Sequence, residues 1–168
     1  MSELDPLPLK PPPLVYHFQE DCWHIHEPAI QQDFPKLLAT IQHQLPLTNT
    51  HFMVDLTFID DDEMAEINHT YRQKNKATNV LSFPHPPLTQ NGKTVILGDV
   101  LFSYTTIANE AITQHKSFAH HLNHLFVHGL LHLLGHDHQR EADATIMESL
   151  EIKILAQHTI PNPYQEKE

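Results

Sequence analysis

Hydrophobic positions recur along this chain with two different periods, and each period predicts one kind of element. Between residues 52 and 59 every second side chain is apolar, which predicts a strand with one buried face. Short apolar runs predict three further strands, at residues 14–18, 80–83 and 95–104. We expect the last of these to be broken at Gly98-Asp99, and Asn91-Gly92 to form the turn before it.

Apolar residues spaced three and four positions apart predict five helices, at residues 28–44, 61–72, 105–114, 117–134 and 140–157. Asp60 or Asp61 is the expected N-cap of the second helix, and Pro35 lies near the start of the first or begins it. The last helix has an expected buried stripe of Ala142, Ile146, Leu150, Ile154 and Leu155. Strands and helices mix without strict alternation, which favours an α+β fold: a small mixed sheet of about four strands, packed with helices, with the 117–134 helix central.

The organisation of the chain follows from its length and composition. We expect a disordered Pro-rich tail at residues 1–13, a single domain at 14–160 and a C-terminal tail at 161–168. No apolar run approaches the roughly 20 residues that cross a bilayer, and no signal pattern is present, so we expect no membrane segment and a cytoplasmic location. The single cysteine, Cys22, excludes an internal disulfide.

The segment 128–138 carries the clearest candidate chemistry. His128 and His132 are four residues apart, so a helix presents both imidazoles on one face. Gly135 can end the helix in a left-handed conformation, which allows His138 to turn back towards the other two. Three neutral imidazoles with one position open to water are the usual ligands of catalytic zinc, so we predict one Zn²⁺ held by these three residues. With 16 histidines in the chain any one pair is weak evidence, but three at this spacing with a glycine at the turn are not.

The spacing of these ligands is that of the metzincin proteases, which carry a glutamate directly after the first histidine as general base. Here that position is Gly129, so the ligands of a peptidase are present without its base. A zinc-bound hydroxide at neutral pH suits hydrolysis, and Asp137 and Asp99 are candidate proton-transfer groups. Alternatively, Asp137 only orients a neighbouring ligand.

A short basic stretch follows the second predicted helix and contains Arg72, Lys74 and Lys76. The net charge of −11 argues against broad nucleic-acid binding, but it does not exclude this local patch. A guanidinium beside a metal ion suits phosphodiester chemistry, because both stabilise charge on phosphate oxygens. We therefore name the three residues as substrate-binding candidates, with Arg72 also catalytic. The alternative for the two lysines is a solvated loop.

The remaining histidines leave alternatives open. His121 and His124 share a helical face with His128, so they either line the approach to the metal or are ordinary core or surface residues. Cys22, His24 and His26 lie close together, but they offer no fourth ligand for a second metal site.

Several stretches together resemble the YbeY family of metal-dependent endoribonucleases, also called ribosomal RNA maturation factors. Residues 128–138 match its pattern H-G-x-L-H-L-x-G-[YH]-D-H throughout. Three further segments resemble its other motifs: Ile67–Arg72, Ala77–Pro84 and Leu97–Val100. The resemblance covers about residues 14–160, and one departure is Asn79, where the family usually has aspartate.

The resemblance implies an α+β fold, zinc bound by His128, His132 and His138, and a phosphate-directed role for Arg72. It also implies cleavage of single-stranded RNA, maturation of the 3′ end of small-subunit ribosomal RNA, and work beside the small ribosomal subunit in ribosome quality control. Two other functions remain compatible with the sequence. A metallopeptidase keeps the metal but lacks the base at Gly129, and a non-catalytic ribosome-associated factor would hold a structural metal with four protein ligands.

Overall fold

A mixed β-sheet organises the structure, a computed structural model that describes residues 12–48, 50–86, 89–90 and 94–165. Within these residues the strands are β1 (Leu14–Phe18), β2 (His51–Ile59), β3 (Val80–Pro84), β4 (Thr89–Gln90) and β5 (Thr94–Ser103). The order is β1-β2-β5-β3, with the short β4 also paired to β5. β1, β2 and β5 run parallel, whereas β3 and β4 are antiparallel to β5. The α+β class and the four predicted strands are confirmed, and the two-residue β4 had no sequence signal.

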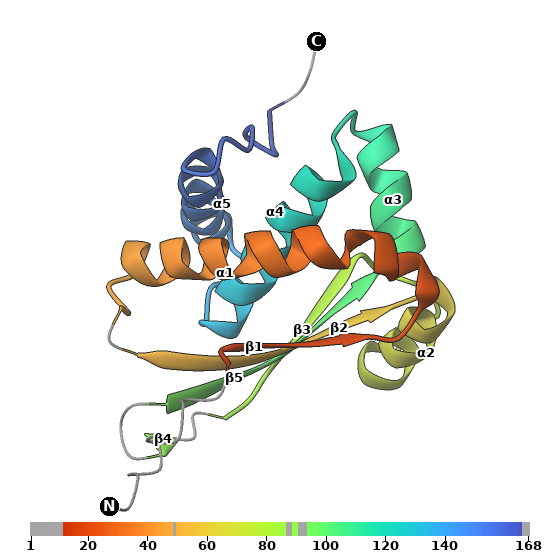
Figure 1. Cartoon of the computed structure of the whole chain (residues 1–168), viewed down its shortest axis with the longest axis horizontal. Coiled ribbons are helices and arrows are strands. Elements are labelled where there is room, and N and C mark those ends of the chain that lie inside the picture. The colour runs from red at the N-terminus through yellow and green to blue at the C-terminus, as the bar shows by residue number, and fades with distance from the viewer. Residues whose placement is uncertain (1–11, 49, 87–88, 91–93, 166–168) are drawn as a thin grey trace, which may run out of the picture.

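The helices form a layer on one face of the sheet, with one helix on the other (Figure 1). A 3-10 helix (Asp21–His26) leads into α1 (Glu27–Gln44), which crosses the sheet on the same side as α4 and α5 (Figure 1). The remaining elements are α2 (Asp61–Arg72), α3 (Tyr104–Thr113), α4 (Phe118–Leu133) and α5 (Glu141–Ala156). Helix α2 packs Met64 against Leu81 and Leu101 on the opposite face, so the sheet is covered on both sides at this end. No helix among the described residues is long and apolar enough to span a membrane.

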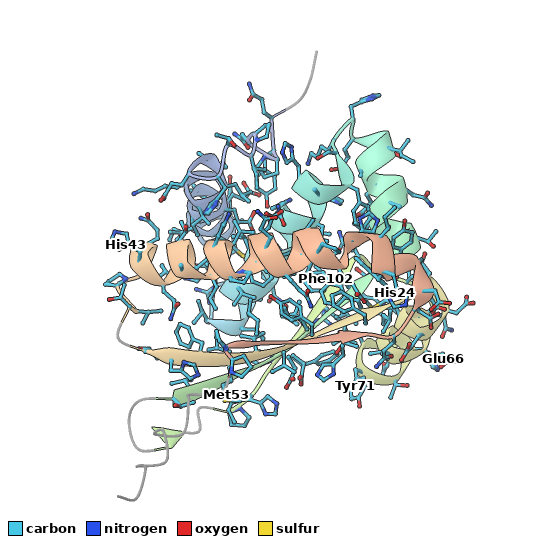
Figure 2. The ribbon with its side chains drawn as sticks, in the orientation of Figure 1. His24, His43, Met53, Glu66, Tyr71 and Phe102 are labelled. Atoms are coloured by element: carbon cyan, nitrogen blue, oxygen red, sulfur yellow. The ribbon has the colours of Figure 1, made fainter. Side chains whose placement is uncertain are left out.

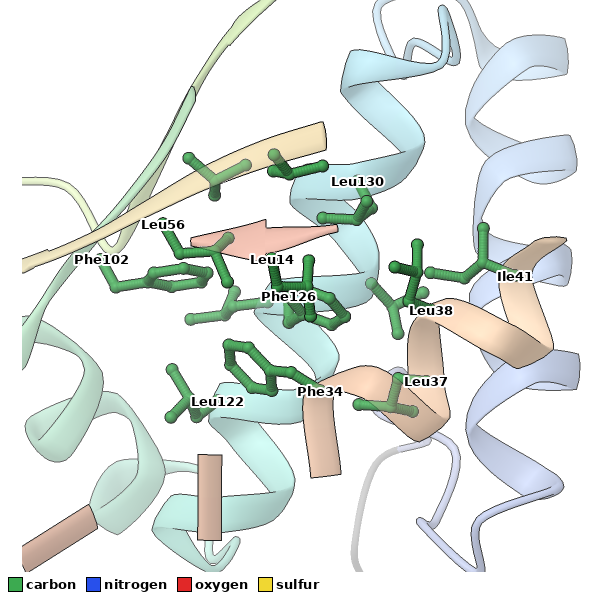
Figure 3. Packing of buried hydrophobic residues seen from close by; sticks show 14 of the residues in the cluster. Leu14, Phe34, Leu37, Leu38, Ile41, Leu56, Phe102, Leu122, Phe126 and Leu130 are labelled. Carbon is green, nitrogen blue, oxygen red and sulfur yellow. The ribbon is translucent and has the colours of Figure 1, made fainter. Parts of the chain in front are cut away.

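The main core lies between the sheet and the layer of α1 and α4. Alternation along β2 places Phe52, Val54, Leu56 and Phe58 in this core, as the sequence pattern predicts. Figure 2 shows Phe102 of β5 in the same space, whereas Met53 and Tyr71 project on the other side of the sheet. Phe34 of α1 stacks on Phe126 of α4 with ring centroids 4.0 Å apart (Figure 3). These contacts fix α4, and therefore its histidines, against the sheet.

Side-chain caps define where two helices begin. The Asp60 carboxylate accepts a hydrogen bond from the Glu63 amide at 2.8 Å, so Asp60 is the N-cap of α2, as expected for one of the two aspartates. Ser117 caps α4 in the same way, accepting from the His120 amide at 3.0 Å. The cap fixes where α4 begins. One face of the helix then packs on the sheet, and position 129 lies on that face.

Gly129 marks the closest approach of α4 to the sheet. A Cβ built on this residue would lie 2.9 Å from Val100 Cγ1 and 3.2 Å from Ser82 Oγ. The Ser82 hydroxyl also donates to the Gly129 carbonyl at 3.1 Å. The glycine after the first histidine therefore serves packing, and the first carbon of a glutamate at this position would press on Val100.

We expect Gly129→Ala to lower the free energy of unfolding by up to about 2 kcal/mol, because overpacking of about 1–3 kcal/mol opposes a helix-propensity gain of about 1 kcal/mol. Urea denaturation measures this change. Ser149→Ala, on the exposed side of α5, is the control and should be neutral or slightly stabilising. An alanine variant at position 129 that unfolds at higher urea than wild type would show that the contact with Val100 relaxes freely.

Strand β5 differs from expectation because it is continuous at Gly98. Its pairing with β2 passes from Met53↔Ile96 to Val54↔Gly98, so one extra residue forms a bulge. Gly98 has a φ of +139°, and a Cβ there would lie 2.1 Å from the Phe83 carbonyl oxygen. The glycine that predicted a break instead marks a bulge with close strand approach.

Two helices also differ from the sequence prediction. Helix α1 begins at Glu27, so Pro35 lies inside it and does not begin it. In α5, Ile146 is 55% exposed, and the buried face carries Met147, Glu151, Ile154 and Leu155. The predicted buried face is therefore rotated about the helix axis relative to the observed one, because the prediction counted only apolar residues as buried.

Some predicted features lie outside the described residues, namely 1–11 of the Pro-rich tail, the Asn91-Gly92 turn and 166–168 of the C-terminal tail. The described part of the C-terminal segment, residues 161–165, contacts the helices: Lys116 Nζ donates to the Pro163 carbonyl at 2.8 Å, and the Tyr164 hydroxyl donates to Glu151. The domain boundary at residue 160 stays a prediction.

Candidate metal centre and adjoining cavity

Helix α4 and the turn after it bring His128, His132 and His138 together. The Nε2 atoms of His128 and His132 are 3.2 Å apart, as their four-residue spacing on one helix face allows. Gly135, with a φ of +96°, follows the helix, and the His136 amide bonds to the Leu131 carbonyl at 2.9 Å. This turn returns the chain so that the His138 ring centroid lies 5.5 Å from that of His128 and 5.0 Å from that of His132.

The three side chains fit a single metal ion. One ring nitrogen from each lies within 4.8 Å of the others. Two nitrogens that bind one zinc ion at about 2.0–2.1 Å in tetrahedral geometry are about 3.3 Å apart, close to the 3.2 Å between His128 and His132. No fourth histidine, cysteine or carboxylate from the described part of the chain joins this group. Three protein ligands leave a coordination position open, as catalytic sites require.

The electrostatics of the cluster favour the metal-binding form of the central ligand. Burial, and then the neighbouring His128 and His138, lower the pKa of His132 to about 4. At neutral pH its imidazole is therefore uncharged, with a lone pair available for a cation.

A cavity of about 580 Å³ opens directly beside the three histidines. One side is lined by residues in and just before β3, namely Thr78, Asn79, Val80, Ser82 and Pro84. The other side is lined by the three histidines and by residues of the turn after α4, namely Gly135, His136, Asp137 and Gln139. Arg72 completes the wall from the end of α2, which stops at Gln73 in a left-handed conformation with a φ of 57°. Residues from α2, β3 and α4, far apart in sequence, therefore meet at one cavity.

The predicted basic residues do not share one position. The Arg72 side chain is exposed, and it has no hydrogen-bond or salt-bridge partner within the described ranges, so its guanidinium is available to a ligand. Lys74 and Lys76 are exposed in the segment that follows and do not line the cavity. Of the three substrate-binding candidates, the structure brings only Arg72 to the histidine cluster.

Asn79, where the family usually has aspartate, lies at the cavity wall without contacting Arg72. Its Nδ2 donates to Glu110 Oε1 at 2.9 Å, and its Oδ1 accepts from the Val80 amide at 2.7 Å. Asn79 therefore fixes the start of β3 against α3 rather than holding Arg72.

The two candidate proton-transfer residues lie in different places. Asp99 is on the far face of the sheet from α4, because its neighbour Val100 is the residue that meets Gly129. It pairs across the strands with Asp55 and has His85 Nε2 at 3.6 Å, so it is excluded from the cavity. Asp137 does line the cavity, and its Oδ1 accepts from the amides of His138 at 2.7 Å and Gln139 at 3.2 Å. These bonds shape the turn that carries the third histidine.

We expect Asp137→Asn to retain bound metal and to lower the rate of hydrolysis at this site by less than about 10-fold, because the amide oxygen can accept the same two hydrogen bonds. A proton-transfer role would give a loss of about 10²–10⁴-fold, since asparagine cannot accept the proton. Single-turnover cleavage with metal analysis of the same preparation distinguishes these outcomes.

Behind the cluster lies a buried carboxylate that the sequence pattern did not predict. Glu151 of α5 is 0% exposed, and its Oε1 is 2.6 Å from His128 Nδ1. Its Oε2 is 2.9 Å from His124 Nε2 and also accepts from the Tyr164 hydroxyl. Burial alone would raise the pKa of Glu151, but hydrogen bonds from the two histidines outweigh it and lower the pKa to about 2. The sequence does contain a signal for this residue, because Glu151 lies four positions from both Met147 and Leu155 and therefore shares their helical face.

The other histidines have structural partners. His124 and His121 are 8% and 3% exposed, so both are largely buried, and their accessible edges line a second cavity of about 340 Å³ that also touches His128. His121 Nε2 lies 2.9 Å from Glu110 Oε1, in a pair separate from the three-histidine group. His24 and His26 lie on the 3-10 helix before α1; His24 pairs with Glu27 at 2.9 Å, and Cys22 is exposed. The residues Cys22, His24 and His26 form no group that could hold a metal.

The fold and the site define an α+β protein with a three-histidine candidate metal centre beside an arginine-lined cavity. A family model described as Endoribonuclease YbeY matches residues 16–159. A protein of Bartonella henselae named Endoribonuclease YbeY is 44% identical over 149 residues, which is 88% of this chain and 94% of that protein. A protein of the same name from Rhizobium johnstonii is 51% identical over 114 residues, covering 67% of this chain and 66% of that protein.

This chain belongs to the YbeY endoribonuclease family. A solution structure of a Thermotoga maritima protein shares the fold with a TM-score of 0.57 at 16% identity, covering 87% of this chain and 91% of that one. The family membership that the 128–138 motif predicts is thus confirmed.

Proposed function

We propose that this member of the YbeY family is a zinc-dependent endoribonuclease that hydrolyses single-stranded RNA at the 580 Å³ cavity. The observation that carries the proposal is the convergence on this cavity of three imidazole nitrogens and one guanidinium that has no side-chain partner among the described residues. His128, His132 and His138 would hold the metal, and Arg72 would bind the phosphate. The zinc ion, when bound, would act as a Lewis acid and lower the pKa of a water molecule at the site.

The residues of the chain have separable tasks in this reaction. Arg72 offers two parallel N–H donors to the non-bridging oxygens of the scissile phosphate, where negative charge increases in the transition state. The Asp137 turn holds His138 in place, and Gly129 allows α4 to pack close to β3, so that both walls stay at a fixed separation. Lys74 and Lys76 would attract the RNA strand beyond the cavity, through salt-dependent contacts with phosphates.

We further propose that the substrate is ribosomal RNA, with processing of the small-subunit 3′ end and ribosome quality control as the cellular task. Membership of the YbeY family supports this assignment. We propose that the protein works in the cytoplasm beside the small ribosomal subunit.

Cleavage of matched RNAs tests the proposal. Purified protein should cut an end-labelled single-stranded RNA internally and leave its duplex form largely intact. A chelator should abolish cleavage, and added Zn²⁺ should restore it. In cells, depletion should lead to accumulation of small-subunit RNA with an extended 3′ end. Metal-loaded protein that leaves single-stranded RNA intact would contradict the proposal.

The two rival functions make different predictions. A structural metal would have four protein ligands, whereas the group found within the described residues has three. A peptidase of the metzincin type needs a glutamate at position 129, where a side chain would meet Val100. Casein should therefore stay intact under conditions in which RNA is cleaved.

A further inference from the structure

We infer that Glu151 is a positioning residue for the metal centre: its carboxylate fixes the tautomer and ring orientation of His128, so that the Nε2 lone pair faces the metal. Tyr164, from the C-terminal segment 161–165, holds that carboxylate from the other side. The inference rests on the proposed metal centre and extends it to two residues outside the ligand set.

The tautomer follows from the hydrogen bond. A carboxylate only accepts, so the 2.6 Å contact between Glu151 Oε1 and His128 Nδ1 requires the proton on Nδ1. In the neutral ring Nε2 then carries the lone pair, and Nε2 is the atom that lies 3.2 Å from His132 Nε2. A histidine that binds a metal commonly donates its other N–H to a carboxylate in this manner.

The second oxygen of Glu151 is held as firmly. His124 Nε2 donates to Oε2 at 2.9 Å, and the Tyr164 hydroxyl donates to the same oxygen. With its proton on Nε2, His124 has an unprotonated Nδ1, and that atom is buried without a hydrogen-bond partner in the part of the chain that the structure describes. Only a lone pair is then left unsatisfied, whereas the opposite tautomer would bury an unpaired N–H at higher cost. The network therefore has one favoured arrangement of protons.

Packing alone does not account for a carboxylate in this position. Glu151 replaces an apolar residue in the buried stripe of α5, between Met147 and Leu155. Burying a charge costs free energy that an apolar side chain of similar size would not, even when the charge is paired. Contact with a metal ligand gives the carboxylate a task that an apolar side chain could not perform.

Glu110 provides a matched comparison within the same molecule. It too accepts from a buried histidine, His121 Nε2, at 2.9 Å, and it too lies against α4. Neither Glu110 nor His121 belongs to the three-histidine group. The two glutamates differ in whether their histidine partner is a predicted metal ligand. They also differ in burial, because the Glu151 side chain is fully buried whereas that of Glu110 is 33% exposed.

The experiment compares Glu151→Gln with Glu110→Gln. Glutamine has one accepting oxygen, so its amide N–H must oppose either His128 Nδ1–H or the donors from His124 and Tyr164. We expect Glu151→Gln to weaken metal binding by about 10- to 100-fold, and Glu110→Gln to change it by less than about 2-fold. Affinity is measured by competition between metal-free protein and a chromogenic chelator, first with Co²⁺ and then with Zn²⁺.

A spectroscopic readout separates positioning from general stability. Nitrogen-15 correlation spectra of the metal-free protein report which ring nitrogen of His128 carries the proton. Wild type and Glu110→Gln should show the proton on Nδ1, whereas Glu151→Gln should show a substantial population with the proton on Nε2. Unchanged affinity together with an unchanged His128 tautomer in Glu151→Gln would overturn the inference.

Tyr164→Phe provides a second variant, because Tyr164 is 42% exposed and the change removes only a hydroxyl. It should weaken metal binding by about 3-fold with little change in melting temperature, since two of the three donors to Glu151 remain. If Glu151→Gln fails to fold, wild-type affinity in Tyr164→Phe overturns the inference. If wild-type protein itself binds no metal, the proposed metal centre fails; if wild type binds and the variants match it, only the positioning role fails.

Discussion

His132→Ala is expected to abolish metal binding and RNA cleavage together. Metal content should fall from about one ion per chain to below about 0.1, and cleavage by at least about 10³-fold, because two imidazoles cannot hold the ion or lower the pKa of its water. His132 is the ligand between the other two, with its Nε2 at 3.2 Å from His128 and its ring 5.0 Å from that of His138. Metal analysis and single-turnover cleavage on one preparation measure both losses.

His136→Ala is the matched control for this prediction. His136 lines the same cavity but lies outside the three-histidine group, so its removal should leave the metal content near one ion per chain. Retention of a full equivalent of metal in His132→Ala, at wild-type affinity, would show that the ion binds elsewhere.

Arg72→Ala is expected to lower RNA cleavage by about 10²-fold while metal content and melting temperature stay nearly unchanged. The structural reason is that Arg72 lines the cavity without a side-chain partner among the described residues, so its truncation breaks no internal contact. Arg72→Lys should recover part of the activity, because an ammonium keeps the charge but loses the two-pronged geometry.

Arg140→Ala removes the same side chain from an exposed position that does not line the cavity, and it should keep cleavage near that of wild type. Arg140 is the N-cap of α5 but makes no side-chain capping bond, so its truncation should not affect the helix. A lower melting temperature with intact cleavage in Arg72→Ala would assign Arg72 to the end of α2 instead of to the substrate.

The sequence by itself determined the elements whose patterns are local. Alternation over residues 52–59 fixed the buried face of β2, since the pleat has a period of two. The four-residue spacing of His128 and His132 fixed their shared face, because α4 is helical whatever it packs against. Gly135 determined the turn to His138 through its backbone freedom, so the three-histidine cluster was predictable.

Tertiary structure alone decided which residues join that cluster from elsewhere. Arg72 reaches the cavity whereas Lys74 and Lys76 do not, because the chain changes direction after α2. Asp99 is excluded from the cavity because successive side chains of β5 point to opposite faces of the sheet. Its neighbour Val100 points towards α4, so Asp99 points away from it. Periodicity gives the faces of an element but not the partner that each face meets, because the partners come from distant parts of the chain.

The same reason explains why Glu151 and Tyr164 were missed. A hydrophobic stripe predicts burial by averaging over apolar residues, so an acid within it counts as exposed and the predicted stripe rotates towards Ile146. The burial of Glu151 is stable only because donors from α4 and from the C-terminal segment converge on it in space. The sequence thus specified the three candidate ligands and the helix that carries them, and only the packing of α5 against α4 placed the carboxylate behind them.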